Sequence, residues 1–185
     1  MRPLQDMHPP SAPAERHVQH YHDGTRRLLY LTTEHYILNN GTIIVSRTDP
    51  DGIITHANRA FVETSGYSEQ ELIGSPHYII RHPDMPRVAF RELWETVSRG
   101  VEWHGYVKNL RKNGGYYWVY ATVAPIVRGD VIIGHTSVRR KVSDQIIAEY
   151  ERKYATLRLR ESMQEASEHE ARESSFLGKL FRRGG

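Results

Sequence analysis

The stretch RHPDMP, at positions 81–86, gathers three groups that could do chemistry on a kinked piece of chain. Arg81 is a permanent cation that can donate two parallel hydrogen bonds to a phosphate or a carboxylate, and Asp84 is a natural counter-ion for it. His82 has an ordinary pKa near cellular pH, so it can change charge in response to a neighbouring group. The two prolines prevent one smooth helix. Such an elbow either lines a ligand site or is a solvated loop with an ion pair.

The composition excludes several classes of site. The 185 residues contain no cysteine, which removes disulfides, iron–sulfur clusters, zinc–thiolate sites and cysteine-adduct photochemistry. The net charge of +3 is too mild to indicate nucleic acid as a partner. No stretch approaches the roughly 18 apolar residues of a membrane span, and residues 1–24 lack the apolar segment of a signal peptide. We therefore expect a cytoplasmic protein. The sequence has no nucleophile–base pair, Walker loop or kinase signature, so we also expect that it is not an enzyme.

Short elements on both sides of the elbow must position it. Residues 42–57 predict two strands joined at a DPDG turn. Asn58 then suits the N-cap of a short helix, and a Ser68–Glu71 capping box begins another. After the elbow, residues 88–97 place their apolar side chains at helical spacing. The elbow therefore connects two helical segments that follow a β-hairpin.

The second half of the chain predicts three more strands and a helix. Strand formers in residues 103–142 are interrupted by NGG and RGD, which are hairpin signals. Strands on both sides of a helical insert indicate an α+β domain whose antiparallel sheet is covered on one face. Residues 1–24 predict a flexible arm, residues 25–38 a short helix, and residues 143 to about 171 a helix. The expected parts are an N-terminal arm over 1–41, a sensor domain over 42–142, and a signalling or dimerisation helix with a basic tail over 143–185.

Several motifs in this order resemble the PAS domain of bacterial aerotaxis receptors, an FAD-binding redox sensor. They are ITHANRAFVETSGYSEQELIGSPH, RHPDMP, WHGYVKNLRKNGGYYWV and TSVRRKVSD, and the resemblance covers roughly residues 42–145. RHPDMP together with KN-R-KNG and YWV is a specific combination, whereas many PAS domains share the asparagine and the GYS-type piece. The resemblance implies a PAS fold with a five-stranded antiparallel sheet, short helices on one face and a C-terminal exit helix. FAD would lie in a slot between the sheet and the helices.

The resemblance also implies that the elbow lines the cofactor. Arg81 would bind a phosphate or form an ion pair with Asp84. Asp84 additionally suits the N-cap of the helix over residues 88–97. His77 and His82 would act as redox-linked groups, or else they are hydrogen-bonded histidines of the helical face.

Four further residues complete the expected site. Asn58 lies near the cofactor in the family, although an ordinary N-cap also explains it. Asn109 is expected on an inward strand position, where a buried amide needs a partner. Trp94 and Trp103 are most simply core aromatics, and in the family their neighbourhood borders the flavin ring. The expected cofactor-binding residues are therefore Asn58, His77, Arg81, His82, Asp84, Trp94, Trp103 and Asn109, with no catalytic residue and no metal.

A redox sensor needs an output and a partner. Reduction of FAD would change its hydrogen bonds with Asn109, and the sheet would pass the change to the exit helix near Ser143 and Asp144. Aerotaxis receptors continue into a membrane anchor and a signalling coiled coil, whereas this sequence ends at Gly185. We therefore expect a homodimer that acts in trans on a signalling protein or receptor. The tail is expected to be a partner-binding or frayed terminus, with weak membrane-surface contact as the alternative, through Phe176, Leu177, Leu180 and Phe181 with Lys179, Arg182 and Arg183.

Two rival functions remain open at this point. A haem-binding gas sensor would use His77 or His82 as the axial ligand. A cofactor-free interaction module would instead pack its helices shut with side chains. The histidines of the N-terminal arm, including His20 and His22, could bind a metal, but in a flexible arm we interpret them as incidental.

Overall fold

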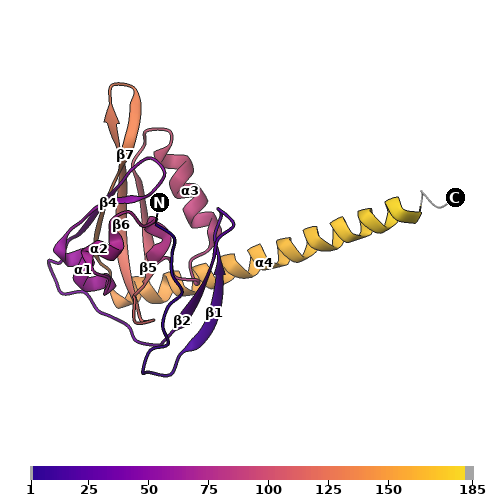
Figure 1. The fold of residues 1–185 in the computed structure, drawn as a ribbon, viewed down its shortest axis with the longest axis horizontal. Coiled ribbons are helices and arrows are strands. Elements are labelled where there is room, and N and C mark those ends of the chain that lie inside the picture. The colour runs from indigo at the N-terminus through magenta and orange to yellow at the C-terminus, as the bar shows by residue number, and fades with distance from the viewer. Residues whose placement is uncertain (1, 182–185) are drawn as a thin grey trace.

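A five-stranded antiparallel sheet forms the centre of the protein in a computed structural model that describes residues 2–181, with side chains described to Ala171 except at His169. The strand order is β4-β3-β7-β6-β5 (Figure 1). The predicted α+β class and five-stranded sheet are confirmed. The elements are β1 (Glu15–His20), β2 (Arg26–Leu31), β3 (Ile44–Thr48), β4 (Ile54–Ala57), α1 (Arg59–Ser65), α2 (Glu69–Leu72), the 3₁₀ helix η1 (His77–Ile80), α3 (Arg87–Val97), β5 (Trp103–Leu110), β6 (Tyr116–Arg128), β7 (Val131–Lys141) and α4 (Asp144–Phe181).

Local sequence signals produce the turns and caps as predicted. The Gly52 N–H donates to the Asp49 carbonyl at 3.1 Å and closes the turn between β3 and β4. Ser68 and Glu71 form the reciprocal capping box of α2. Gly114 in the NGG turn has a φ of +88°, and a Cβ there would collide with a backbone carbonyl of β2.

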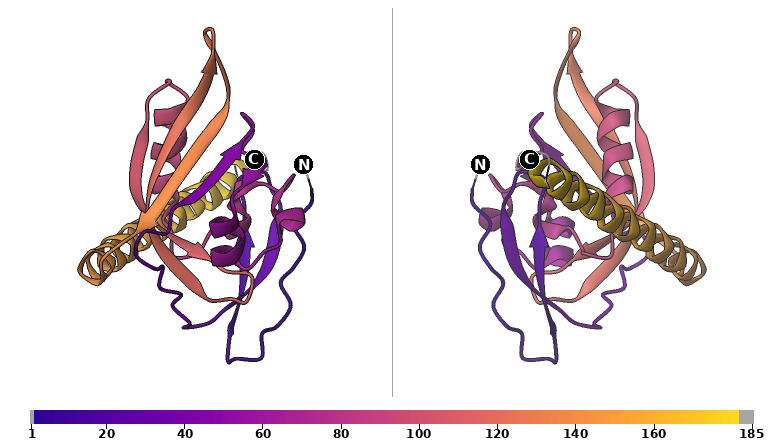
Figure 2. Two further views of the ribbon diagram at one scale, coloured as in Figure 1. Left: turned by 90° about the vertical axis from the view of Figure 1, so that its left-hand side faces the viewer. Right: turned by 90° about the vertical axis from the view of Figure 1, so that its right-hand side faces the viewer.

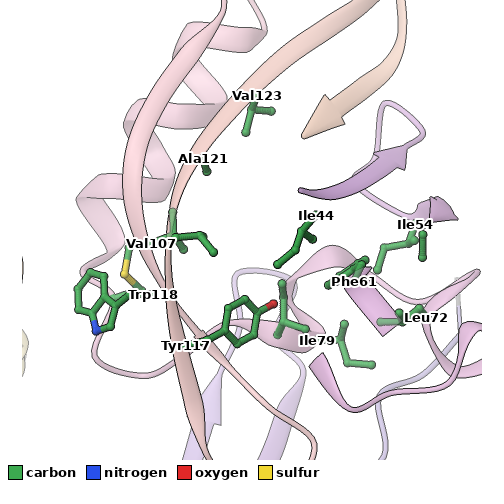
Figure 3. Packing of buried hydrophobic residues seen from close by; sticks show 14 of the residues in the cluster. Ile44, Ile54, Phe61, Leu72, Ile79, Val107, Tyr117, Trp118, Ala121 and Val123 are labelled. Atoms are coloured by element: carbon green, nitrogen blue, oxygen red, sulfur yellow. The ribbon is translucent and has the colours of Figure 1, made fainter. Parts of the chain in front are cut away.

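The two faces of the sheet carry different elements. Residues directly opposite in β5 and β6 share a face, so Asn109 and Tyr117 lie on one face, and Lys108 and Trp118 on the other. Figure 3 shows Tyr117 pointing from β6 toward Phe61 of α1, whereas Trp118 points away. We call the side covered by α1, α2 and η1 the inner face and the side contacted by α4 the outer face.

The N-terminal region folds onto the domain, which corrects two expectations. The predicted arm contains β1, and the helix predicted over residues 25–38 is wrong because β2 pairs there with β1 as an antiparallel hairpin. The reason is tertiary: Leu29 is fully buried with Leu110 and Met7, and Arg27 of the same strand is only 4% exposed. Alternate residues of β2 therefore face the domain, as the period of a strand allows.

Helix α4 begins where the exit helix was predicted and extends ten residues beyond the expected end. Its Tyr154 hydroxyl donates to the Tyr106 carbonyl at 2.6 Å, and its ring stacks on Trp118 at 6.0 Å. Figure 1 shows that α4 then continues beyond the rest of the molecule, and Figure 2 shows the same helix foreshortened, with its C-terminal part in front of or behind the domain. The tail residues expected to bind a partner or a membrane surface lie outside the part whose side chains are described. Within residues 2–181, no helix is long and apolar enough to cross a membrane.

Candidate functional site

The inner face of the sheet holds buried polar groups that have no partner among the residues that the structure describes. Asn109 of β5 is 4% exposed and its Nδ2 donates to nothing, and the hydroxyl of the fully buried Tyr117 is also unpartnered. Burial raises the pKa of Tyr117 to about 12, against the charge of Arg139, whose guanidinium lies near the hydroxyl without the geometry of a hydrogen bond. Trp103, 6% exposed, has an indole N–H without a partner as well. Because buried polar groups are nearly always hydrogen-bonded, this set is typical of a site that a ligand completes.

Arg139 of β7 is a further buried group on the inner face with polar atoms that lack a partner among the described residues. Its side chain is 2% exposed, and its guanidinium lies 4.5 Å from the centre of the Phe61 ring. One terminal nitrogen donates to Ser46, while Nε and the other terminal nitrogen have no partner. Within the described part of the chain no carboxylate pairs with it, and burial lowers the pKa of Arg139. An uncompensated buried cation is costly, so the position favours a ligand with acceptor or anionic groups.

His77 lies beside this guanidinium. Its Nε2 is 3.2 Å from the Ser46 hydroxyl, and its ring stacks on Phe61 with 5.9 Å between the centroids. Burial and then the Arg139 charge lower the pKa of His77 to about 3. The imidazole is therefore neutral at cellular pH and contributes a hydrogen bond, rather than a charge, to the surroundings of Arg139.

Asn58 has a structural role that uses its whole amide. Its Oδ1 accepts from the N–H groups of Phe61 and Val45, both at 3.0 Å, and its Nδ2 donates to the Ile43 carbonyl at 2.9 Å. The predicted N-cap is confirmed. Binding of a cofactor by Asn58 stays a prediction, and no free polar atom of its amide supports it.

Arg81 is the first residue of the elbow and lies at the edge of the sheet. Its backbone forms an antiparallel bridge with Asn109, so the elbow runs along the free edge of β5. Its guanidinium lies 4.4 Å from the centre of the Phe90 ring, and its buried Nε has no partner. The predicted ion pair with Asp84 is not present among the described contacts. Arg81 therefore keeps a free donor next to Asn109, which suits the alternative of an anionic ligand group.

Asp84 contacts the outer side of the sheet and α4. Its Oδ2 accepts from Lys108 Nζ at 2.6 Å, and its Oδ1 is 3.5 Å from Arg158 of α4. Burial alone would raise the pKa of Asp84, but the Lys108 hydrogen bond and the neighbouring positive groups lower it overall. The predicted N-cap role is wrong, because Pro86 occupies the N-cap of α3. None of these contacts lies on the inner face of the sheet.

The side chain of His82, like that of Asp84, contacts groups away from the inner face. Its Nδ1 accepts from the Asp84 N–H at 3.0 Å, and its ring is 6.0 Å from that of Tyr116. Burial, and then the charge of Lys108, lower the pKa of His82 to about 3. His82 is thus a neutral, hydrogen-bonded histidine between the elbow and β5.

The two tryptophans have different environments. Trp103 is buried in the core, as predicted, whereas Trp94 is 42% exposed and is not a core residue. Trp94 meets the His135 ring at 5.3 Å and lies over the turn at Gly52. The indole therefore contacts one aromatic side chain and the Gly52 turn and remains partly in solvent.

Sequence reasoning missed Arg139, Tyr117 and Ser46. The available signal was strand alternation, which places Arg139 on the same face as Ile44 and Ala121, its partners in β3 and β6. Beside another arginine and a lysine, however, it resembled a solvated basic strand end. Among the described residues there is no cluster of three or more possible metal ligands.

Comparisons with known proteins agree with this architecture. Residues 54–133 match the family described as PAS fold. The aerotaxis receptor of Escherichia coli (strain K12) is 42% identical over 151 residues, which are 82% of this chain and 30% of the receptor. The nitrogen fixation regulatory protein of Klebsiella pneumoniae is 27% identical over 108 residues, which are 58% of this chain and 22% of that protein. The chain thus spans less than a third of the length of these relatives.

Solved structures support the same fold. The light-state structure of the blue-light photoreceptor Aureochrome1 LOV has a TM-score of 0.53 at 24% identity, covering 61% of this chain and 88% of that one. A structure described as "Flavin Analogue Sheds Light on Light-Oxygen-Voltage Domain Mechanism" has a TM-score of 0.52 at 22% identity, covering 62% and 86%. At these identities the likeness shows the fold alone. Together with the sequence relatives, it shows that this chain carries a PAS domain related to that of the aerotaxis receptor.

Proposed function

We propose that this PAS domain binds FAD between the inner face of the sheet and the helices, and signals its redox state to a partner protein. The observation that carries the proposal is the set of buried polar groups without partners on Asn109, Tyr117, Trp103 and Arg139. The Arg139 guanidinium lies 4.5 Å from the centre of the Phe61 ring, and Tyr117 and Trp103 belong to the same hydrophobic core. A flavin combines an apolar ring with an edge of acceptors, so it suits a site of this composition.

Each residue has a separate task in this proposal. Bound FAD supplies reversible electron transfer. Arg139 stabilises negative charge, because its buried guanidinium has no counter-ion. Asn109 and Tyr117 orient the ring edge through directional hydrogen bonds, and the apolar wall excludes water. Arg81, with its free Nε next to Asn109, would bind a polar or anionic part of the cofactor at the edge of β5.

The proposed output is a protein–protein signal and not a reaction. The relatives named above include a receptor and a regulatory protein. We propose that the domain works as a homodimer in the cytoplasm, without nucleic acid, and acts in trans on a signalling protein or receptor of the aerotaxis type. Bound cofactor, rather than a bound substrate, then determines the conformation that the partner recognises.

Absorption spectroscopy of the purified protein tests the cofactor. Flavin bands, followed by release of FAD on heating, are the expected result. A sharp haem band would contradict FAD, and His77 and His82 would become the residues to replace as axial ligands. A colourless protein that takes up no FAD on refolding would leave a cofactor-free interaction module.

A further inference from the structure

Helix α3 is capped by a side chain from α4. The N–H groups of Arg87 and Val88 donate to the two carboxylate oxygens of Glu161, at 3.0 and 2.8 Å. Pro86 at the N-cap provides no side-chain hydrogen bond, so α3 has no cap of its own. The first N–H groups of a helix need acceptors, and its positive end favours a carboxylate. Glu161 satisfies both requirements from 73 residues away in the sequence.

A second contact lies one turn earlier on the same side of α4. Arg158 donates to the Asp84 carbonyl and lies 3.5 Å from the Asp84 carboxylate, which also accepts from Lys108 of β5. Residues three apart share a helix face, so Arg158 and Glu161 act on neighbouring parts of the chain. We call the contacts of Asp84, Arg87 and Val88 with Arg158 and Glu161 the α3–α4 clasp.

The clasp lies where α4 leaves the domain. Upstream, the partly buried side chains of Tyr150 and Leu157 pack against the hydrophobic core. Downstream, residues 162–168 are all exposed. Figure 1 shows α4 extending into solvent beyond α3. Beyond the clasp, α4 keeps an exposed ion pair between Glu165 and Arg87, and the protruding segment that follows is the part of α4 available to a partner.

The other side of α3 belongs to the domain interior. Phe90 and Leu93 pack against the core, and Phe90 lies under the Arg81 guanidinium at 4.4 Å. A shift of α3 would therefore move both the Phe90 ring under Arg81 and the two N–H groups held by Glu161. By thermodynamic reciprocity, a group that stabilises one position of α3 also stabilises the docked position of α4.

We propose that Glu161 is a positioning residue that couples the position of α3 to the docking of α4 on the domain. The α3–α4 clasp then carries the signal out of the domain. This route differs from the expected one through the sheet and Ser143, because it leaves the domain at the far end of the docked segment. Coupling between α3 and α4 is a property of the chain itself. Its use for redox signalling rests on the proposed function.

Hydrogen exchange on the full chain without added flavin tests the coupling. Glu161→Ala removes the cap, and Glu165→Ala is the matched control because Glu165 pairs with the exposed side chain of Arg87. Alanine favours helix more than glutamate, so neither variant weakens α4 as a helix. In Glu161→Ala we expect at least fivefold faster exchange in α3 residues 91–97 and in α4 residues 150–158, and less than twofold change in the control.

These amides do not bond to Glu161, so their exchange reports coupling rather than the lost hydrogen bonds. Unchanged exchange in either helix of Glu161→Ala would overturn the coupling.

The same measurement on the FAD-loaded protein, oxidised and chemically reduced, tests the signal. We expect reduction to change exchange in α4 of the wild type and to change it at least fivefold less in Glu161→Ala, with FAD content retained. A full response in Glu161→Ala would overturn the proposed route, whereas failure of the wild type to bind FAD would contradict the proposed function and leave the flavin-free comparison to decide the coupling.

Discussion

Two buried arginines in different parts of the molecule have opposite surroundings. Arg27, in the N-terminal hairpin, donates to the carbonyls of Gln5 at 2.7 Å and Ile79 at 3.0 Å, and to the Tyr67 hydroxyl at 3.0 Å. Arg139, in the inner face of the sheet, donates to one hydroxyl and leaves two nitrogens without partners. Each guanidinium nitrogen of Arg27 therefore has a hydrogen-bond partner within the fold, and the bond to Ile79 connects the hairpin to η1. The guanidinium of Arg139 lacks two of its partners, which is expected of a residue that binds a ligand.

Replacing each arginine by methionine gives the largest expected contrast. In flavin-free protein, Arg27→Met should lower the free energy of unfolding by about 2–4 kcal/mol, because it leaves buried acceptors without donors. Arg139→Met should cost less than about 1 kcal/mol or stabilise, because it removes an uncompensated charge. Urea denaturation of both variants measures the difference. Equal losses would show that Arg139 is as well satisfied as Arg27.

The pH dependence of stability tests the environment around Arg139. The pKa of His77 is about 3 in the folded chain against 6.5 for the unfolded one, so between these values the unfolded state binds more protons. Its contribution to stability is complete above pH 6.5 and is lost as pH falls, at about 1.4 kcal/mol per pH unit. His77→Gln should remove this part of the slope, and denaturation between pH 5 and 7 measures it. If the pH slope of stability were unchanged in His77→Gln, the His77 side chain would be solvated rather than buried.

His82 should give a slope of the same sign, because its folded pKa is also about 3. The exposed His56 is a control for the substitution itself.

Two buried tyrosines extend the contrast at a smaller scale. The Tyr67 hydroxyl accepts from Arg27, whereas the Tyr117 hydroxyl has no partner. Tyr67→Phe should therefore cost about 1 kcal/mol, and Tyr117→Phe in flavin-free protein about zero. Thermal unfolding of both variants checks the pair. A loss in Tyr117→Phe as large as in Tyr67→Phe would mean that the inner hydroxyl is already hydrogen-bonded without a ligand.

Much of the fold could be predicted because its signals are local. Alternation, turn residues and the Ser68–Glu71 capping box each act within a few positions. The hairpin of β1 and β2 could not be predicted, because it depends on burial of Leu29 and Arg27 against distant elements. Helical spacing and strand alternation are both compatible with so short an apolar run.

The site was harder to predict than the fold. Asp84 was expected next to the cofactor, but its strongest partner, Lys108, lies 24 positions away on the outer face. Arg139 was missed because two adjacent arginines in a strand point to opposite faces, and only the assembled sheet shows which one is buried. Asn109 was anticipated as an inward strand amide, and it is 4% exposed.

The most direct test of the central claim is the FAD affinity of Arg139→Gln compared with Arg140→Gln. Arg140 is the adjacent, exposed arginine of the same strand, so both variants lose one charge and keep the same side-chain type. In a titration of flavin-free protein, followed by fluorescence, Arg139→Gln should bind FAD at least tenfold more weakly than the wild type, and Arg140→Gln within twofold of it. Equal affinity of the two variants would contradict the assignment of Arg139 to the flavin site.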